Sequence, residues 1–239
     1  MKAKEFVASP EWSFPYPPLP HHFNGFTGVN VLCRIPKGII KPLLPKPLKL
    51  DGDGDLFVLA WGHTPDCDGY NVHEIQINIP VKWRNNSGHH TLIEYIDSDM
   101  GLIAGREIWG YPKKMGNIVW TKTAKGYRLE CSREGVLLMR TEFSASSSAP
   151  AVDWPDMRNN YLVKRVPPAS RSASPLIQLV RVAPSEMVIH STANGSARVE
   201  FFDGPHDPLT HLGPIEVLGA TLQTAYLVLD YGEVVATLK

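Results

Sequence analysis

Two adjacent lysines, Lys113 and Lys114, stand in the segment 105–116, which reads GREIWGYPKKMG. Apolar or aromatic side chains flank this pair at three positions, Trp109, Tyr111 and Met115. Apolar surroundings disfavour the ammonium form and lower the pKa of a lysine, and a second cation nearby lowers it further. A lysine that is neutral near pH 7 attacks carbonyl carbon. The segment predicts that Lys113 forms a Schiff base with a ketone or aldehyde, and the alternative is a solvated lysine pair on a turn.

The same segment resembles the GRE…PKK signature of the acetoacetate decarboxylase superfamily, which is the standard example of a lysine activated by a neighbouring cation. Further blocks agree with that family in order and spacing: 44–48, 79–81, 160–162 and 202–209. In the first block Lys46 stands where the family has an acid. The resemblance runs from about residue 27 to the end of the chain.

The resemblance implies a role for three residues of this chain. Lys113 corresponds to the Schiff-base lysine, and Lys114 corresponds to the lysine that perturbs its pKa. Glu74, upstream of Ile79-Pro80-Val81, corresponds to an active-site glutamate. Taken alone, Glu74 reads as a solvent-facing carboxylate on a strand.

Two positions depart from the family's pattern. The family has an arginine before its first core strand and a second glutamate in the strand before His63, and Phe26 and Val58 stand at these sites. Arg34 is the nearest arginine, and a slip of the alignment would place it in the pocket instead. Without an arginine, a substrate carboxylate loses a charge-assisted clamp. The departures favour a larger, more apolar carbonyl substrate and a diverged lyase: an aldolase-dehydratase, a cyclase or a decarboxylase of specialised metabolism.

Glu94 interrupts an otherwise apolar run at 91–96. It is a candidate proton carrier in the pocket, and the alternative is an exposed or salt-bridged glutamate. We expect the substrate to contact Phe26, Val58, Glu94, Trp109, Tyr111 and Met115.

Short runs rich in β-branched and aromatic residues recur between turn signals along the chain, which is typical of an all-β barrel or sandwich. Such runs are 29–35, 56–61, 71–79, 91–96, 117–123, 127–133, 136–143, 177–182, 185–191, 197–202 and 215–230. Helix signals are few, after Pro36 (38–44) and after Pro208. We predict a mainly β (α+β) fold, a closed β-barrel or cone of the acetoacetate decarboxylase type with few short helices around an internal cavity. Residues 1–26 form a proline- and aromatic-rich extended arm, and residues 27–239 form a single domain.

Composition limits the partners. Lysine plus arginine equals aspartate plus glutamate, at 24 each, so no basic field exists to attract nucleic acid or a membrane surface. Three widely spaced cysteines and the absence of an apolar leader favour a reducing, cytoplasmic location. The nine histidines show no metal-ligand spacing, and neither a metal nor a cofactor is expected. We expect a small-molecule carbonyl substrate and a homo-oligomer. The competing function is a non-catalytic barrel that binds an apolar carbonyl ligand.

Overall fold

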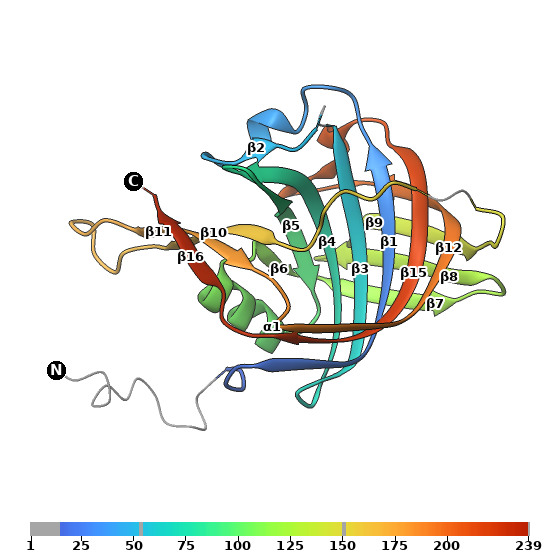
Figure 1. Cartoon of the computed structure of the whole chain (residues 1–239), viewed down its shortest axis with the longest axis horizontal. Coiled ribbons are helices and arrows are strands. Elements are labelled where there is room, and N and C mark those ends of the chain that lie inside the picture. Colours follow the sequence, from blue (N-terminus) through green and yellow to red (C-terminus); the bar gives the residue numbers. More distant parts are fainter. Residues whose placement is uncertain (1–14, 53–54, 150–151, 239) are drawn as a thin grey trace.

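The computed structural model describes residues 15–52, 55–149 and 152–238. Strands dominate these residues, as the sequence predicts, and one large sheet contains most of them (Figure 1). The strands of this sheet are β1 (His21–Arg34), β2 (Lys49–Leu50), β3 (Leu56–Cys67), β4 (Tyr70–Trp83), β5 (Asn86–Ile96), β6 (Lys113–Met115), β7 (Asn117–Lys122), β8 (Gly126–Arg133), β9 (Val136–Ala145), β10 (Asn160–Val166), β11 (Leu176–Val182), β12 (Glu186–Phe201), β15 (Glu216–Leu229) and β16 (Glu233–Thr237). The short pair β13 (Asp203–Gly204) and β14 (Asp207–Pro208) forms a separate sheet.

The large sheet has the order β16-β11-β10-β5-β4-β3-β1-β15-β12-β9-β8-β7, with β2 added to β4 and β6 added to β5. Its neighbours are antiparallel except for the parallel pairs β10·β5 and β5·β6. The sheet is strongly curved (Figure 1). Among the described residues its end strands β16 and β7 do not pair, so the sheet is not closed into a barrel. The expected mainly β cone is therefore confirmed, whereas ring closure into a barrel is wrong.

Alternation along β4 explains how one strand serves both the core and the cavity. Ile75, Ile77 and Ile79 are fully buried in the main hydrophobic core. Glu74 and Gln76, which flank Ile75 in sequence, line the cavity on the opposite face. Since successive side chains of a strand face opposite sides, the polar face of this strand is the cavity wall and not a solvated surface.

The helix that precedes the lysine segment was not predicted from the sequence. Helix α1 (Asp99–Ala104) begins after Ser98, whose hydroxyl accepts a hydrogen bond from the backbone of Gly101 at 3.2 Å, and continues into the π-turn η4 (Gly105–Trp109). Six residues of α-helix are too few to show a 3.6-residue hydrophobic period. The two predicted helices are only the 3-10 turns η3 (Lys41–Leu43) and η5 (Leu209–Leu212).

The N-terminal part of the chain joins the sheet earlier than predicted. Strand β1 begins at His21 and pairs with β15 and β3, so the last residues of the proposed arm belong to the sheet. Trp12 and Phe14 of that arm lie outside the described residues. Tyr16 donates a hydrogen bond to Glu107 at 2.8 Å. The division into arm and single domain stays a prediction.

The first half of strand β12 has a strand partner on one side only among the described residues. From Glu186 to Asn194 it pairs with β15, and its pairing with β9 begins only at Gly195. About half of each side chain is exposed at three apolar positions on this edge, Met187, Val188 and Ile189. An exposed apolar edge is suited to pairing with another chain, and the predicted homo-oligomer stays a prediction.

In the described parts of the chain, no helix has the length and apolar character needed to cross a membrane.

Candidate active site

Two glycines of the GREIWGYPKK segment shape the approach to Lys113. The Lys113 side chain lies against Gly105, where an added Cβ would come within 2.5 Å of Lys113 Cε. Gly110 ends the π-turn with a φ of 90° and lies directly against the backbone of Lys164 on β10. A residue with a Cβ fits neither position, because the first is filled by the lysine and the second needs a left-handed backbone. Arg106 then fixes the strand by donating a hydrogen bond to the Lys113 carbonyl at 3.0 Å.

The register between β5 and β6 decides which lysine faces the cavity. These strands are parallel and pair Glu94 with Lys113 and Tyr95 with Lys114. Lys113 Nζ lies 3.0 Å from Glu94 Oε1 and 3.7 Å from Glu74 Oε2. Only 10% of the Lys113 side chain is exposed, and the Glu94 side chain is fully buried. The structure thus places one amine between two carboxylates from neighbouring strands.

These carboxylates change the expected charge of the lysine. Burial is the largest effect and lowers the pKa of Lys113, but Glu94 and then Glu74 raise it, and the result lies above the ordinary lysine value. Burial also raises the pKa of Glu94 to about 8, against the opposing effect of Lys113. The two carboxylates therefore oppose the low pKa that was predicted for Lys113, and the sequence did not indicate that they lie beside the amine.

Lys114 belongs to a different cluster on the opposite face of β6. Its Nζ donates hydrogen bonds to Asp207 Oδ1 at 2.6 Å and to the His206 carbonyl at 2.9 Å. Asp207 is 1% exposed and also accepts hydrogen bonds from Tyr95 at 2.7 Å and Arg133 at 3.1 Å. Because Asp207 compensates its charge, the role of Lys114 in tuning Lys113, implied by the resemblance, has no support in this geometry. Lys114 instead joins β6 to β14.

The Asp207 cluster provides a test of acid stability. Burial alone raises the pKa of Asp207, but hydrogen bonds from Lys114 and Tyr95 outweigh it and hold the pKa below the ordinary value of 3.8. A lowered folded-state pKa stabilises the fold above the unfolded pKa, and this contribution is lost as the pH falls through the folded pKa. Asp207→Asn should lower the free energy of unfolding by roughly 3 kcal/mol at pH 7. The difference from wild type should shrink below about pH 4.

Urea denaturation at pH 7 and pH 3.5 measures this difference. Glu216→Gln is the matched control, because Glu216 pairs with Arg34 at 3.1 Å on the surface. Exposed pairs of this kind contribute little, and the control should stay within about 0.5 kcal/mol of wild type. An equal loss for Asp207→Asn at both pH values would contradict the assignment.

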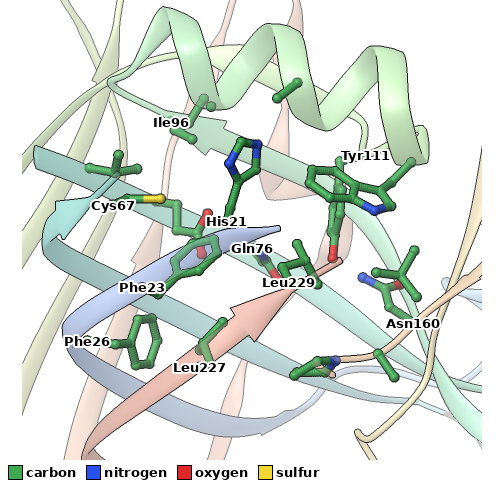
Figure 2. A pocket seen from close by; sticks show the side chains of 18 of the residues that line it. His21, Phe23, Phe26, Cys67, Gln76, Ile96, Tyr111, Asn160, Leu227 and Leu229 are labelled. Atoms are coloured by element: carbon green, nitrogen blue, oxygen red, sulfur yellow. The ribbon is translucent and has the colours of Figure 1, made fainter. Parts of the chain in front are cut away.

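Lys113 lines a cavity of about 700 Å³. Figure 2 shows this cavity with most of the side chains around it. Apolar and aromatic side chains make up most of its wall, including Phe23, Phe26, Val72, Ile96, Met100, Trp109, Tyr111, Leu227 and Leu229. The predicted site residues Lys113, Glu74, Phe26, Trp109 and Tyr111 all line it, and Glu94 lies behind the lysine. Burial, then Glu94 and Glu74, raise the pKa of Tyr111 above its ordinary value. The wall is suited to a ligand with a largely apolar body.

Phe26, which the resemblance places where the family's pattern has an arginine, lines the cavity. Its ring lies over two glycines, since an added Cβ would approach it within 2.9 Å from Gly28 and within 3.0 Å from Gly62. The same Cβ on Gly62 would lie 3.1 Å from Glu74 Cγ. Because Gly28 and Gly62 have no side chains, the aromatic ring of Phe26 has room beside Glu74.

Three sequence-based expectations differ from the structure. Val58 is buried but pairs with Asn78, four residues along β4 from Glu74 and about 13 Å away, and it does not line the cavity. Met115 is 44% exposed and does not line the cavity either, since it lies two residues beyond Lys113 near the end of β6. Arg34 pairs with Glu216 on the surface and does not enter the pocket.

Sequence reasoning misses His21, Gln76 and Asn160 on the cavity wall, as Figure 2 shows. Asn160 belongs to the Asn-Tyr-Leu block that resembles the family, but nothing in the sequence indicated that its side chain faces the cavity. His21 and its neighbour His22 read only as an adjacent pair. In the described ranges, no group of three or more histidine, cysteine, aspartate or glutamate residues has an arrangement that could hold a metal ion.

The curved sheet and its buried lysine define a mainly β protein with an amine-bearing cavity. The family model for acetoacetate decarboxylase (ADC) matches residues 6–238, and the chain belongs to this family. The acetoacetate decarboxylase of Clostridium acetobutylicum is 26% identical over 235 residues, which cover 96% of this chain and 94% of the relative.

Solved structures agree with this fold. Acetoacetate decarboxylase from Legionella pneumophila aligns with a TM-score of 0.85 at 18% identity, covering 97% of this chain and 93% of the other. The enduracididine biosynthesis enzyme MppR, complexed with the condensation product of pyruvate and imidazole 4-carboxaldehyde, aligns with a TM-score of 0.77 at 19% identity, covering 93% and 91%. The chain is thus an acetoacetate decarboxylase-like protein in fold.

Proposed function

We propose that this protein is a Schiff-base-forming lyase that acts on a ketone, keto acid or aldehyde with a larger and more apolar body than acetoacetate. The observation that carries the proposal is the buried Lys113 amine, 3.0 Å from Glu94, at the wall of a largely apolar cavity of about 700 Å³. A protein that only bound an apolar ligand would gain nothing from burying an amine beside two carboxylates, since buried charges are costly.

Glu94 supplies the proton transfers that Schiff-base formation requires. Its carboxylate takes a proton from the Lys113 ammonium across 3.0 Å, which gives a neutral amine and a carboxylic acid. The amine then attacks the carbonyl carbon, and Glu94 returns the proton to the oxygen that leaves as water. The transfer needs an ionised Glu94, so adduct formation should rise with pH through about 8, the pKa to which burial raises this group.

The resulting iminium withdraws electrons from the neighbouring carbon. Loss of carbon dioxide, aldol addition, retro-aldol cleavage and dehydration all proceed through the enamine that follows. The acetoacetate decarboxylase relatives support the first reaction, and the condensation product bound to MppR supports the aldol type. Phe26 in place of an arginine favours a substrate without a carboxylate to clamp.

Reductive trapping tests the proposal. The protein is incubated with 2-octanone or with pyruvate and treated with borohydride, and the modified peptide is located by mass spectrometry. We expect a stable secondary amine on Lys113, at a higher yield with the apolar ketone. Modification spread over exposed lysines, with none at Lys113, would contradict Schiff-base chemistry at this site. Trapping at Lys113 without turnover of any carbonyl compound would favour the binding function.

Acetoacetate is expected to be a poor substrate. With Phe26 at the arginine position, its carboxylate lacks a charged hydrogen bond, which contributes about 1.5–3 kcal/mol in proteins. This loss corresponds to roughly 10- to 150-fold in kcat/KM. Carbon dioxide release from acetoacetate, compared with the Lys113→Ala variant, measures the activity. Rapid release that disappears in the variant would overturn this prediction and restore the simple decarboxylase function.

A further inference from the structure

His21 is a buried imidazole at the cavity wall that the lysine chemistry leaves unused. It is 3% exposed and lies at the start of β1. Its ring meets Trp109 edge-on, with centroids 5.9 Å apart. Figure 2 shows the ring among the side chains that surround the pocket. The cavity therefore holds a titratable group from β1 besides the carboxylates of β4 and β5.

Asp68 fixes the orientation of this ring. His21 Nδ1 lies 2.8 Å from Asp68 Oδ2, and the backbone N–H of His22 donates to Asp68 Oδ1 at 3.2 Å. Asp68 is held in the turn between β3 and β4 with a φ of 51°. Since an ionised carboxylate only accepts hydrogen bonds, Nδ1 carries the proton of this contact. Nε2 is then the free position of the ring.

Nε2 is buried and has no hydrogen-bond partner among the described residues. Buried polar atoms are normally paired, and an exception calls for an explanation such as a bound ligand. His21 lines the cavity, and a histidine that is oriented by a carboxylate and has its other nitrogen unpaired has the arrangement of a general acid–base. Cys67, which precedes Asp68 in the chain, lines the same cavity as His21 and Lys113.

We propose that His21 is the acid–base residue for the substrate carbon next to the Schiff-base carbon, and that Asp68 positions it. This inference rests on the proposed function. Glu94 and Glu74 lie within 4 Å of Nζ and serve the nitrogen and the leaving oxygen. His21 Nε2 takes the α-proton of the iminium, the C–H electron pair forms the C=C bond, and the C=N π pair moves to the Lys113 nitrogen. The products are a neutral enamine and an imidazolium paired with Asp68, and the reverse step protonates the enamine carbon.

Proton exchange tests this step without knowledge of the natural substrate. In deuterium oxide, 2-butanone bound as a Schiff base should exchange its α-protons for deuterium, which NMR follows directly. His21→Gln should keep the borohydride-trapped adduct and slow the exchange about 100-fold or more. Asp68→Asn should slow exchange less while also keeping the adduct. His22→Gln is the matched control, because His22 contacts the Tyr226 hydroxyl at 2.9 Å and does not line the cavity.

The outcomes separate the two proposals. If no adduct is trapped in the wild-type protein, Schiff-base chemistry and with it the role of His21 are overturned. An adduct with wild-type exchange in His21→Gln would show that the His21–Asp68 contact only joins β1 to the β3–β4 turn. An adduct without any exchange in wild type would also overturn the role of His21, while Schiff-base chemistry would stand. Thermal unfolding of each variant shows whether it has folded.

Discussion

Lys113→Arg is expected to abolish the borohydride-stable adduct and to reduce turnover by roughly 10⁴-fold or more, the scale seen when a nucleophile is removed. The guanidinium keeps the positive charge beside Glu94 and Glu74, so the electrostatic environment of the cavity is largely retained. It cannot act as a nucleophile, because arginine stays protonated in proteins. Adduct mass and steady-state turnover of an apolar ketone measure the two effects.

Lys114→Arg is the matched control for this substitution. The same change one residue away keeps a cation within reach of Asp207, whose carboxylate accepts hydrogen bonds from Lys114 and Arg133. Adduct formation should stay within a few-fold of wild type. A loss as large as that of Lys113→Arg would mean that the second lysine takes part in the chemistry, against the geometry of β6.

Glu94→Gln is expected to have two opposite effects, a lower pKa of Lys113 and slower catalysis. Without this carboxylate, the effect of burial on Lys113 is opposed mainly by the more distant Glu74, at 3.7 Å, so the pKa of Lys113 should fall. Adduct formation should then extend to lower pH than in wild type. Adduct formation and turnover should both become about 100-fold slower or more, because the amide cannot carry protons to the leaving oxygen, so the trapped adduct is compared after it has reached equilibrium.

The pH profile of trapped adduct and the steady-state rate are measured on the same preparations. Glu74→Gln is the comparison, and it should move the profile less, since Glu74 affects the pKa of Lys113 less than Glu94 does. A Glu94→Gln profile displaced to higher pH, or an unchanged rate, would contradict the role given to Glu94.

The strands could be predicted from the sequence because their signals are local. Alternation of Ile75, Ile77 and Ile79 with polar residues needs no knowledge of the rest of the chain. Ring closure could not be predicted in this way, because it depends on whether β16 meets β7, two strands more than 100 residues apart in sequence. Helix α1 was missed because its capping by Ser98 is clear only once its six residues are known to be helical.

The sequence predicted a buried lysine at the cavity, but it did not predict the charged groups around that lysine. The lysine segment identifies Lys113 through residues next to it in the chain, but its electrostatic partners come from β4 and β5. Glu94 gives no periodic or motif signal beyond a carboxylate in an apolar run. His21 and Asp68 are 47 residues apart, and only the pairing of β1 with β3 brings them together. Sequence spacing cannot show such contacts.

The parallel register of β5 and β6 has a consequence for insertions and deletions in this segment. Neighbouring residues of a strand face opposite sides, so removal of one residue between Gly110 and Lys113 would bring Lys114 to the position opposite Glu94. The slipped chain would still present an amine to the cavity, but Asp207 would lose the partner that holds β14 to this face. With two adjacent lysines, an amine would therefore still face the cavity after such a change of register, whereas the ion pair of Lys114 with Asp207 favours the observed alignment of the two strands.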